Sequence, residues 1–319
     1  MRPDIHYKIY PTLLDAWWKF QNQRLEDFFY QDEQGGWHIN YNEQTGEYHY
    51  SQEEMDALLE QELIDKINRV PTEPSEAASK GTIFNEVVDC IIEHRACHRE
   101  GWTVFSGKDI ADFFNKKFGV QLLRHKDDPK QDFMVYKKGD ESYLMPYYGI
   151  FEKIDKPFIY GALDGFDFYF DANFCKQVAA YFAGALPQYY IEAVMPVRYG
   201  NVLLYGWIDE LRKDVVYDLK TTKRYEFGNY AHYWQRHVYP YCLIESGDSK
   251  AIKGFEFTVV KWAGGTKYNP VISGEMYKEY YTYDHCESSA LIRQECERFI
   301  EWLDANRDKI TDKKIFNEQ

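Results

Sequence analysis

The sequence lacks any long run of apolar residues. None of its 319 residues belongs to an uninterrupted hydrophobic segment near the ~20 residues that a membrane-spanning helix needs. The N-terminal residues Met1–Tyr10 also lack the apolar centre of a secretory signal. The sequence therefore predicts a soluble protein that works inside the cell and has no membrane partner.

Cysteine is scarce, and positive charge is not in excess. Lys and Arg total 38 against 52 Asp and Glu, which gives a formal net charge of −14. This balance excludes a protein that coats nucleic acid or anionic membrane through bulk charge, but not a local basic groove such as Lys108–Lys130. The scattered cysteines exclude a dense disulfide framework and favour reduced thiols in a cytosol. They are Cys90, Cys97, Cys175, Cys242, Cys286 and Cys296.

Aromatic residues, in contrast, make up 18% of the chain and include 28 Tyr and 8 Trp. Tyrosine commonly lies at the edge of a core, where its ring is buried and its hydroxyl reaches water. Aromatic rings at a surface also serve as stacking platforms for nucleic-acid bases. Composition alone leaves both interpretations open.

The first part of the chain reads as helical, with one polar excursion. Thr12 is placed to cap a first helix, with Asp15 as its capping-box partner. Residues 31–51 are polar and rich in glycine, which predicts a hairpin-like insertion. A second helix is expected over Ser51–Asn68, a connector over 71–79 and a third helix over about 82–98.

The second half alternates between strand and helix patterns. Strands are predicted over 190–198, 202–210, 215–220 and 254–262, and helices over 229–244 and 286–307. Strands combined with flanking helices predict an α/β fold built on a central mixed sheet. We therefore expect a mainly helical N-terminal extension over residues 1–79 and one compact domain over residues 80–319.

Two carboxylates and an ammonium are predicted to converge in this second half. Asp218 and Lys220 point to the same face because side chains alternate along a strand. The tight turn at 212–214 brings Asp209 alongside Asp218 on the neighbouring strand. Hard oxygen ligands at such a point suit one or two Mg²⁺ or Mn²⁺ ions. A lysine beside them can orient water or stabilise phosphoryl charge, which is the equipment for phosphodiester hydrolysis.

The ordinary alternative is a surface hairpin with solvated charges. The apolar run Val215–Tyr217 argues against it, because a buried strand rarely ends in unpaired charges without a reason.

Three short motifs in this region resemble those of the PD-(D/E)XK nuclease superfamily, and most of all its RecB-like branch of phage and other exonucleases. They are a Gly-x-x-Asp strand over Gly206–Asp209, an Asp-x-Lys-Thr strand end over Asp218–Thr221, and a Gln-x-x-x-Tyr helix over Gln235–Tyr239. The resemblance covers about residues 80–262. It implies a restriction-endonuclease-like core and metal-dependent cleavage of DNA.

The resemblance also implies roles for individual residues. Asp209 and Asp218 would bind the metal together with the Leu219 carbonyl, and Lys220 would be the catalytic lysine. Gln235 and Tyr239 would contact DNA or support the site, as would the neighbouring Thr221 and Thr222.

The first motif of the family is altered in this chain. It normally places His or Glu on a helix, but Asn85 follows Gly81-Thr82-Ile83-Phe84 here. Asn85 fits by position, Glu86 fits by chemistry as a metal ligand and catalytic carboxylate, and Asp89 lies one turn further on the face of Asn85. These alternatives stay open. A second departure is Pro240, which predicts a kink or a helix end directly after Tyr239.

No further cofactor is expected. Cys286 and Cys296 stand apart within a helix pattern, which argues against the iron–sulfur cluster of some RecB-like nucleases. The sequence Gly101–Lys108 has the wrong spacing for a phosphate-binding loop, so we expect no nucleotide cofactor.

The function expected from the resemblance is a Mg²⁺- or Mn²⁺-dependent deoxyribonuclease, and an exonuclease more than an endonuclease. It would act on duplex ends or single strands in DNA recombination, repair or phage DNA processing, in the cytoplasm of a bacterium or a phage-infected cell. A recombinase, single-strand-binding or helicase partner and an oligomer are compatible with this role. The alternatives are a decayed nuclease fold that binds DNA or assembles without cleaving, and an acidic, Tyr-rich binding protein whose motif match is accidental.

Overall fold

The computed structural model describes residues 4–31, 37–95, 103–107, 121–123, 132–138, 141–147, 158–249, 251–266 and 269–318. Only the backbone is described for the four short segments between residues 103 and 147 and for residues 31, 37, 269 and 270. The basic segment predicted over Lys108–Lys130 and the phosphate-loop-like stretch Gly101–Lys108 therefore fall outside the described side chains, as does Cys97.

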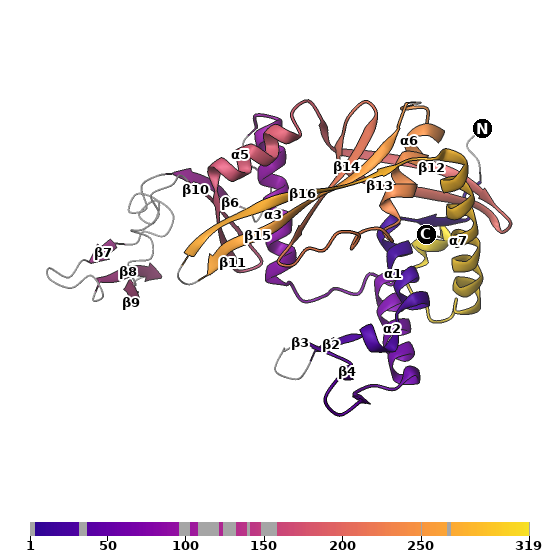
Figure 1. The fold of residues 1–319 in the computed structure, drawn as a ribbon, viewed down its shortest axis with the longest axis horizontal. Helices are drawn as coiled ribbons and strands as arrows, with labels where there is room; N and C mark the ends of the chain where they lie inside the picture. Colours follow the sequence, from indigo (N-terminus) through magenta and orange to yellow (C-terminus); the bar gives the residue numbers. More distant parts are fainter. Residues whose placement is uncertain are drawn as a thin grey trace.

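Within these residues, nine strands form one curled mixed sheet (Figure 1). The strands are β1 (Tyr7–Ile9), β6 (Thr103–Gly107), β10 (Phe158–Leu163), β11 (Phe166–Asp171), β12 (Leu186–Val197), β13 (Gly200–Leu211), β14 (Val215–Thr222), β15 (Gly254–Thr266) and β16 (Asn269–Thr282). Their order is β1-β13-β14-β15-β16-β11-β10-β6, and β12 pairs along β13. The pairs β1/β13, β14/β15 and β11/β16 are parallel and the others are antiparallel.

Helices cover both faces of this sheet, so the predicted α/β class with a helix-flanked mixed sheet is confirmed. The helices are α1 (Pro11–Asn22), α2 (Gln52–Ile67), α3 (Glu76–Ile92), α5 (Ala172–Tyr181), α6 (Gln235–Glu245) and α7 (His285–Ala305). One apolar core joins α1, α6 and α7 to β13–β15, and a second joins α3 and α5 to β10 and β11. In Figure 1, α3 and α5 lie toward one end of the sheet and α1, α6 and α7 toward the other.

Strand β14 contributes side chains to both cores. Val216 lies in the core of α6 and α7, whereas Tyr217 and Leu219 lie in the core of α3. The alternation therefore aims the even-numbered side chains of β14 toward α6 and the odd-numbered ones toward α3.

Several smaller elements lie outside the nine-stranded sheet. Two hairpins, β2 (Phe29–Gln31) with β3 (Trp37–Ile39) and β4 (Tyr41–Asn42) with β5 (Glu47–Tyr48), form the insertion predicted over 31–51. The strands β7 (Gln121–Leu123), β8 (Asp132–Lys138) and β9 (Glu141–Tyr147) form a separate sheet. Short 3₁₀ helices cover Leu25–Asp27 (η1) and Lys313–Phe316 (η4).

Helix starts follow the predicted caps in part. Ser51 and Glu54 form a full capping box at the start of α2, as predicted. The predicted cap Thr12 is wrong, because α1 begins at Pro11 after Tyr10, without a side-chain cap. Helix α3 begins at Glu76, six residues before the prediction, because Ser75 supplies a cap inside the expected connector, and it ends at Ile92 instead of residue 98.

Two further differences lie in the second half. Helix α6 runs through Pro240 to Glu245, so the helix does not end after Tyr239. Strand β16 has no counterpart among the predicted strands, because its alternating Tyr, Lys and Glu residues give little apolar signal.

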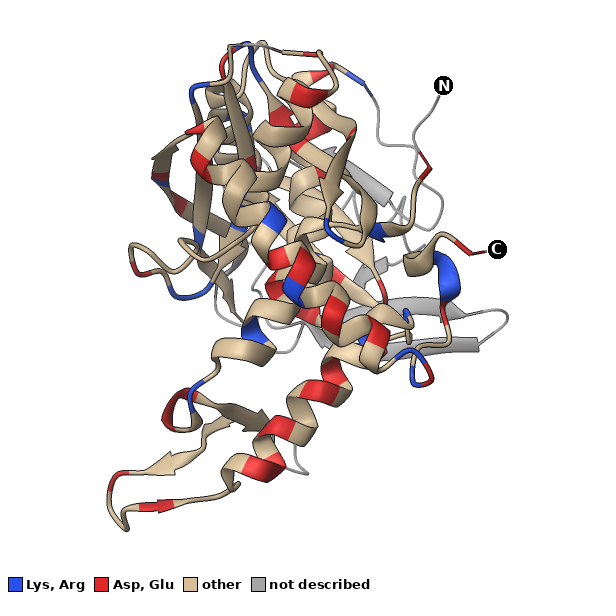
Figure 2. Ribbon diagram, turned by 90° about the vertical axis from the view of Figure 1, so that its right-hand side faces the viewer, with Lys and Arg blue, Asp and Glu red and all other residues tan. Residues whose placement is uncertain are grey.

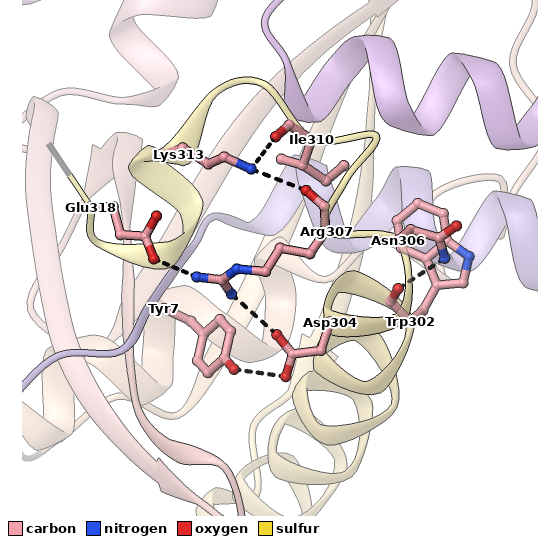
Figure 3. Close-up of polar contacts among 8 residues, drawn as sticks. All are labelled: Tyr7, Trp302, Asp304, Asn306, Arg307, Ile310, Lys313 and Glu318. Atoms are coloured by element: carbon pink, nitrogen blue, oxygen red, sulfur yellow. Dashed lines mark hydrogen bonds and ion pairs between the residues drawn. The ribbon is translucent and has the colours of Figure 1, made fainter.

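The N-terminal segment is built into the main sheet. Strand β1 pairs with β13 in parallel, and the hydroxyl of Tyr7 donates to Asp304 Oδ2 at 2.9 Å. Figure 3 shows how Arg307 joins Asp304 to Glu318, and how the Lys313 ammonium donates to the Arg307 carbonyl at 3.0 Å. These contacts hold strand β1 against the end of α7, and the end of α7 against the 3₁₀ helix η4. In the described part of the chain, no helix is both long and apolar enough to cross a membrane.

Candidate functional site

The candidate site lies where β13 and β14 separate. Strand β13 pairs with β1 through residues 202–204 and with β14 only through Glu210 and Leu211. In the described structure, residues 205–209 pair with neither of these two strands along that edge. Here the Asp209 side chain accepts a hydrogen bond that a backbone carbonyl of β13 would accept in a continuous ladder. The Leu219 amide donates to Asp209 Oδ2 at 2.9 Å. A side chain therefore bridges the two strands at the point where the backbone ladder stops.

Asp218, Lys220 and Gln235 form a closed ring of polar contacts. Lys220 Nζ lies 2.7 Å from Asp218 Oδ2 and donates to Gln235 Oε1 at 2.9 Å. Gln235 Nε2 donates in turn to Asp218 Oδ1 at 2.6 Å. Asp218 is only 2% exposed, and a carboxylate this deep requires such compensation. The sequence delivers it by placing Asp218 and Lys220 two residues apart on β14, facing the first turn of α6.

The protonation of these groups follows from burial and from their closeness. Burial, aided by the charge of Asp218, raises the pKa of Asp209 to about 8. Burial works against the charge of Lys220, but Asp218 and Asp209 outweigh it and raise the pKa of the ammonium. Lys220 is therefore a fixed cation, suited to stabilise negative charge rather than to accept a proton.

Tyr239 and Gly206 connect the helix motif to the strand motif. The Tyr239 ring is 4% exposed and lies against the backbone of Gly206. A Cβ added at residue 206 would be 2.7 Å from Tyr239 Cε1, so the ring or the strand would have to shift to accommodate it. The glycine of Gly-x-x-Asp thus makes room for the tyrosine of Gln-x-x-x-Tyr. Burial, with the charge of Asp218, raises the pKa of Tyr239, so its hydroxyl stays protonated.

Helix α3 brings Asn85 to the other side of Leu219. Asn85 Nδ2 lies 3.5 Å from the Leu219 carbonyl oxygen, at the limit of a hydrogen bond. Its Oδ1 is buried and has no hydrogen-bond partner among the described residues. The oxygen and nitrogen of an amide group have nearly the same shape, so a flipped Asn85 would direct Oδ1 toward the Leu219 carbonyl. A cation between the two oxygens would offset their repulsion, since amide and carbonyl oxygens are ligands of hard cations.

Glu86 points elsewhere. Its Oε1 forms an ion pair with Arg95 Nη1 at 2.7 Å and accepts from the Cys90 thiol at 3.5 Å. Asp89 is buried, which raises its pKa to about 7. Of the three first-motif alternatives, Asn85 is the one favoured by a contact with the β14 backbone beside Asp218.

Thr221 and Thr222 close the end of β14. A Cβ added at Gly81 would lie 2.8 Å from Thr221 Oγ1, so this glycine lets α3 approach the strand closely. The Thr222 hydroxyl donates to the Arg224 carbonyl at 2.6 Å and shapes the turn that follows. Both threonines support the backbone around the site.

The oxygen donors around Leu219 are of the kind that a hard cation prefers, although the set is unusual. It would comprise the carboxylates of Asp209 and Asp218, the amide oxygen of Asn85 and the carbonyl of Leu219. Only two of these are acidic, and no group of three or more His, Cys, Asp or Glu side chains among the described residues is arranged to hold a metal ion. The orphaned Asn85 Oδ1 is the observation that favours a cation here.

Asp15 is a neighbour of the site that sequence reasoning did not identify. Its Oδ1 accepts from the Trp234 amide at 2.7 Å, directly before Gln235 in the chain. Burial raises the pKa of Asp15 to about 6. The two residues are 219 positions apart, and no local pattern connects them.

Comparison with known proteins adds little. No protein-family model matches the chain, and no curated protein is similar to it in sequence. Among solved structures it is similar to one described as "Crystal structure of SSO0001", with 13% identity and a TM-score of 0.25 over 35% of this chain and 49% of that chain. An overlap of this size assigns neither a fold nor an activity, so the function has to be inferred from the site.

Proposed function

We propose that the chain is a metal-dependent deoxyribonuclease with a restriction-endonuclease-like core of the PD-(D/E)XK type, and that it degrades DNA from an end. The observation that carries this proposal is the meeting of Asp209, Asp218, Lys220 and Gln235 around Leu219. These residues come from three separate motifs. A purely structural role does not require an Asp-Lys-Gln ring beside a second buried carboxylate. Perturbed, clustered ionisable groups are typical of catalytic sites.

The oxygens of Asp209, Asp218, Asn85 and Leu219 would hold Mg²⁺ or Mn²⁺. When bound, such an ion supplies Lewis-acid stabilisation of the phosphoryl group and lowers the pKa of an attacking water.

The other roles in catalysis and in shaping the site belong to side chains of the protein. Lys220 holds a positive charge at the end of β14, where it can stabilise the charge that develops on the phosphoryl oxygens. Gln235 fixes the orientation of both Asp218 and Lys220 through its two amide contacts. Tyr239 fills the space over Gly206 and keeps the first turns of α6 seated against β13. Asp209 fixes the separation of β13 and β14 through the Leu219 amide.

A second candidate function is DNA binding or assembly without cleavage. It is favoured by one observation, the replacement of an acidic ligand by Asn85, which leaves two carboxylates for the metal. The ammonium of Lys220 already neutralises Asp218 in the absence of an ion.

Digestion of DNA separates the two candidates. End-labelled linear duplex, linear single-stranded DNA and covalently closed circular DNA are incubated with the protein and Mn²⁺, Mg²⁺ or EDTA. Metal-dependent release of mononucleotides from linear DNA, with circular DNA left intact, supports the exonuclease. Cleavage of the circle supports an endonuclease. Binding of all substrates without cleavage in either metal supports the decayed fold.

A further inference from the structure

A cavity of about 570 Å³ lies between α1, α2 and the segment that leads into α6. Its lining includes Trp18, Lys19 and Phe20 from α1, Lys66 from α2, and His232 and Tyr233. None of these side chains belongs to the ring of contacts around Asp218. The size of the cavity is that of a site for a small organic group rather than for a single ion.

Aromatic rings dominate one wall of this cavity. The rings of Trp18 and His232 are stacked, with centroids 4.4 Å apart and an interplanar angle of 21°. His232 is exposed and Trp18 is half-buried, so the stack forms part of the accessible surface. Tyr233 follows directly in the chain. A planar group can extend such a stack without being recognised by hydrogen bonds.

Two lysines and two acidic residues, Asp15 and Glu62, line the cavity, so an anion is favoured only beside Lys66. Lys19 is paired with Glu62 at 2.7 Å. Lys66, in contrast, has no ion-pair partner among the described residues. The outer side of α2 carries Asp and Glu along its length (Figure 2), which would repel nucleic acid from that side. Lys66 stands near the end of α2, where the chain turns toward the site.

The cavity shares a wall with the candidate site. Lys220 Nζ lies 5.4 Å from the centroid of the Tyr233 ring. Asp15, which also lines the cavity, accepts from the amide of Trp234 directly before Gln235. A DNA strand with one phosphate at Lys220 would therefore have the neighbouring nucleotide at the entrance of this cavity.

We propose that this cavity binds one unpaired nucleotide of a DNA strand, with its base extending the Trp18–His232 stack and its phosphate contacting Lys66. The inference rests on the proposed function, since it places the nucleotide next to the one whose phosphate reaches Lys220. Recognition through ring faces makes the binding independent of base identity. In this proposal the N-terminal helices α1 and α2 hold a frayed strand end beside the catalytic residues.

The test uses the full-length protein and thymidine oligonucleotides that carry one 2-aminopurine at each of the positions near either end. Binding is measured in EDTA, where cleavage is blocked, by 2-aminopurine fluorescence and by anisotropy. The variants are His232→Ala, Lys66→Gln and Trp18→Phe. The control is Lys253→Gln, at an exposed lysine directly before β15 that pairs with Asp214, and all variants are checked for folding by thermal unfolding. His232 is exposed, so its variant decides the question even if changes at Trp18 impair folding.

We expect one labelled position to show quenching with wild type, and His232→Ala to abolish it while Trp18→Phe retains it. Affinity should fall about tenfold in His232→Ala, in the range for loss of one base–aromatic stack, and stay unchanged in Lys253→Gln. Lys66→Gln should weaken binding and make the salt dependence shallower by about one ion. Unchanged affinity and quenching in both His232→Ala and Lys66→Gln would overturn the proposal.

Cleavage in Mn²⁺ is scored separately, so the two proposals can fail independently. Binding that depends on His232 without any cleavage supports the cavity and overturns the nuclease. Cleavage with binding unaffected by His232 and Lys66 supports the nuclease and overturns the cavity. A protein that binds no oligonucleotide in EDTA overturns the cavity, and one that in addition cleaves no DNA in Mn²⁺ overturns both proposals.

Discussion

The ring of Tyr239 occupies the space that a side chain at residue 206 would fill. This contact places a helix residue against a strand residue three positions before Asp209. It also explains why glycine and tyrosine stand at these two positions, since each is required by the other. The relationship can be tested without any assumption about activity.

Gly206→Ala should destabilise the protein by about 1–3 kcal/mol, the usual cost of overpacking a tight contact. In a Tyr239→Ala background the same change should cost much less, because the added methyl then meets open space. The measurement is a double-mutant cycle by urea unfolding. Additive effects of the two changes would show that the contact is not the reason for the glycine.

Asn85→Asp should bind Mn²⁺ about tenfold or more tightly than wild type. A carboxylate in place of the amide adds a negative charge close to the divalent cation, worth about 8 kcal/mol at 4 Å and an effective dielectric of 20, before the cost of burying it. Isothermal titration calorimetry measures the change.

Glu86→Gln is the matched comparison for the other first-motif alternative. It should leave Mn²⁺ affinity unaltered and lower stability, because it removes the more buried of the two carboxylates, Glu86 and Glu93, that pair with Arg95. If Glu86→Gln weakened metal binding and Asn85→Asp did not change it, the assignment of Asn85 would be wrong.

His237 should make the protein lose stability in mild acid. Burial, with the nearby charge of Arg236, lowers the pKa of His237 from 6.5 to about 4. Between these values the unfolded chain binds a proton that the folded chain does not, so stability falls as the pH drops from 6.5 to 4, by roughly 3 kcal/mol. His237→Asn removes this group. Urea unfolding at several pH values should therefore give a shallower acid loss for the variant, and parallel curves would show that His237 is not the cause.

Asp15 should make the protein lose stability as the pH rises, which is opposite to the effect of His237. Burial raises its pKa from 3.8 to about 6, so the folded chain holds the extra proton and stability falls as the pH rises through this window. Asn at this position keeps an oxygen for the Trp234 amide but carries no charge. We expect Asp15→Asn to match wild type near pH 4 and to exceed it by up to about 3 kcal/mol at pH 7. A variant less stable than wild type at pH 7 would show that the charge of Asp15 is needed.

The strands that carry the site could be predicted because their signals are local. Alternating apolar residues define β12 to β14, and the turn at 212–214 pairs Glu210 with Tyr217, which brings Asp209 to the Leu219 amide. The capping box of α2 is equally local. These features depend on residues within a few positions of one another, which a sequence displays directly.

The remaining features depend on tertiary packing. Asn85 and Glu86 are adjacent in sequence, and only the rotation of α3 about its axis, about 100° per residue, decides which one contacts Leu219. Asp15 reaches Trp234 across 219 positions because α1 packs near α6. Strand β16 carries mostly polar side chains and is defined by its pairing with β15. None of these three could be derived from periodicity.

We propose that Asp209 and Lys220 serve metal-dependent DNA cleavage. The most direct measurement is the Mn²⁺-dependent cleavage rate of linear DNA by wild type, Asp209→Asn, Lys220→Ala and the control Lys253→Gln, each confirmed to be folded. Asp209→Asn keeps an acceptor for the Leu219 amide, so its effect on rate is not an effect on strand pairing. We predict a loss of about 10²–10³-fold in both site variants, the range for removing one charge-stabilising group, and full activity in the control. Equal rates in all four proteins, or no cleavage by wild type in any metal, would contradict the claim.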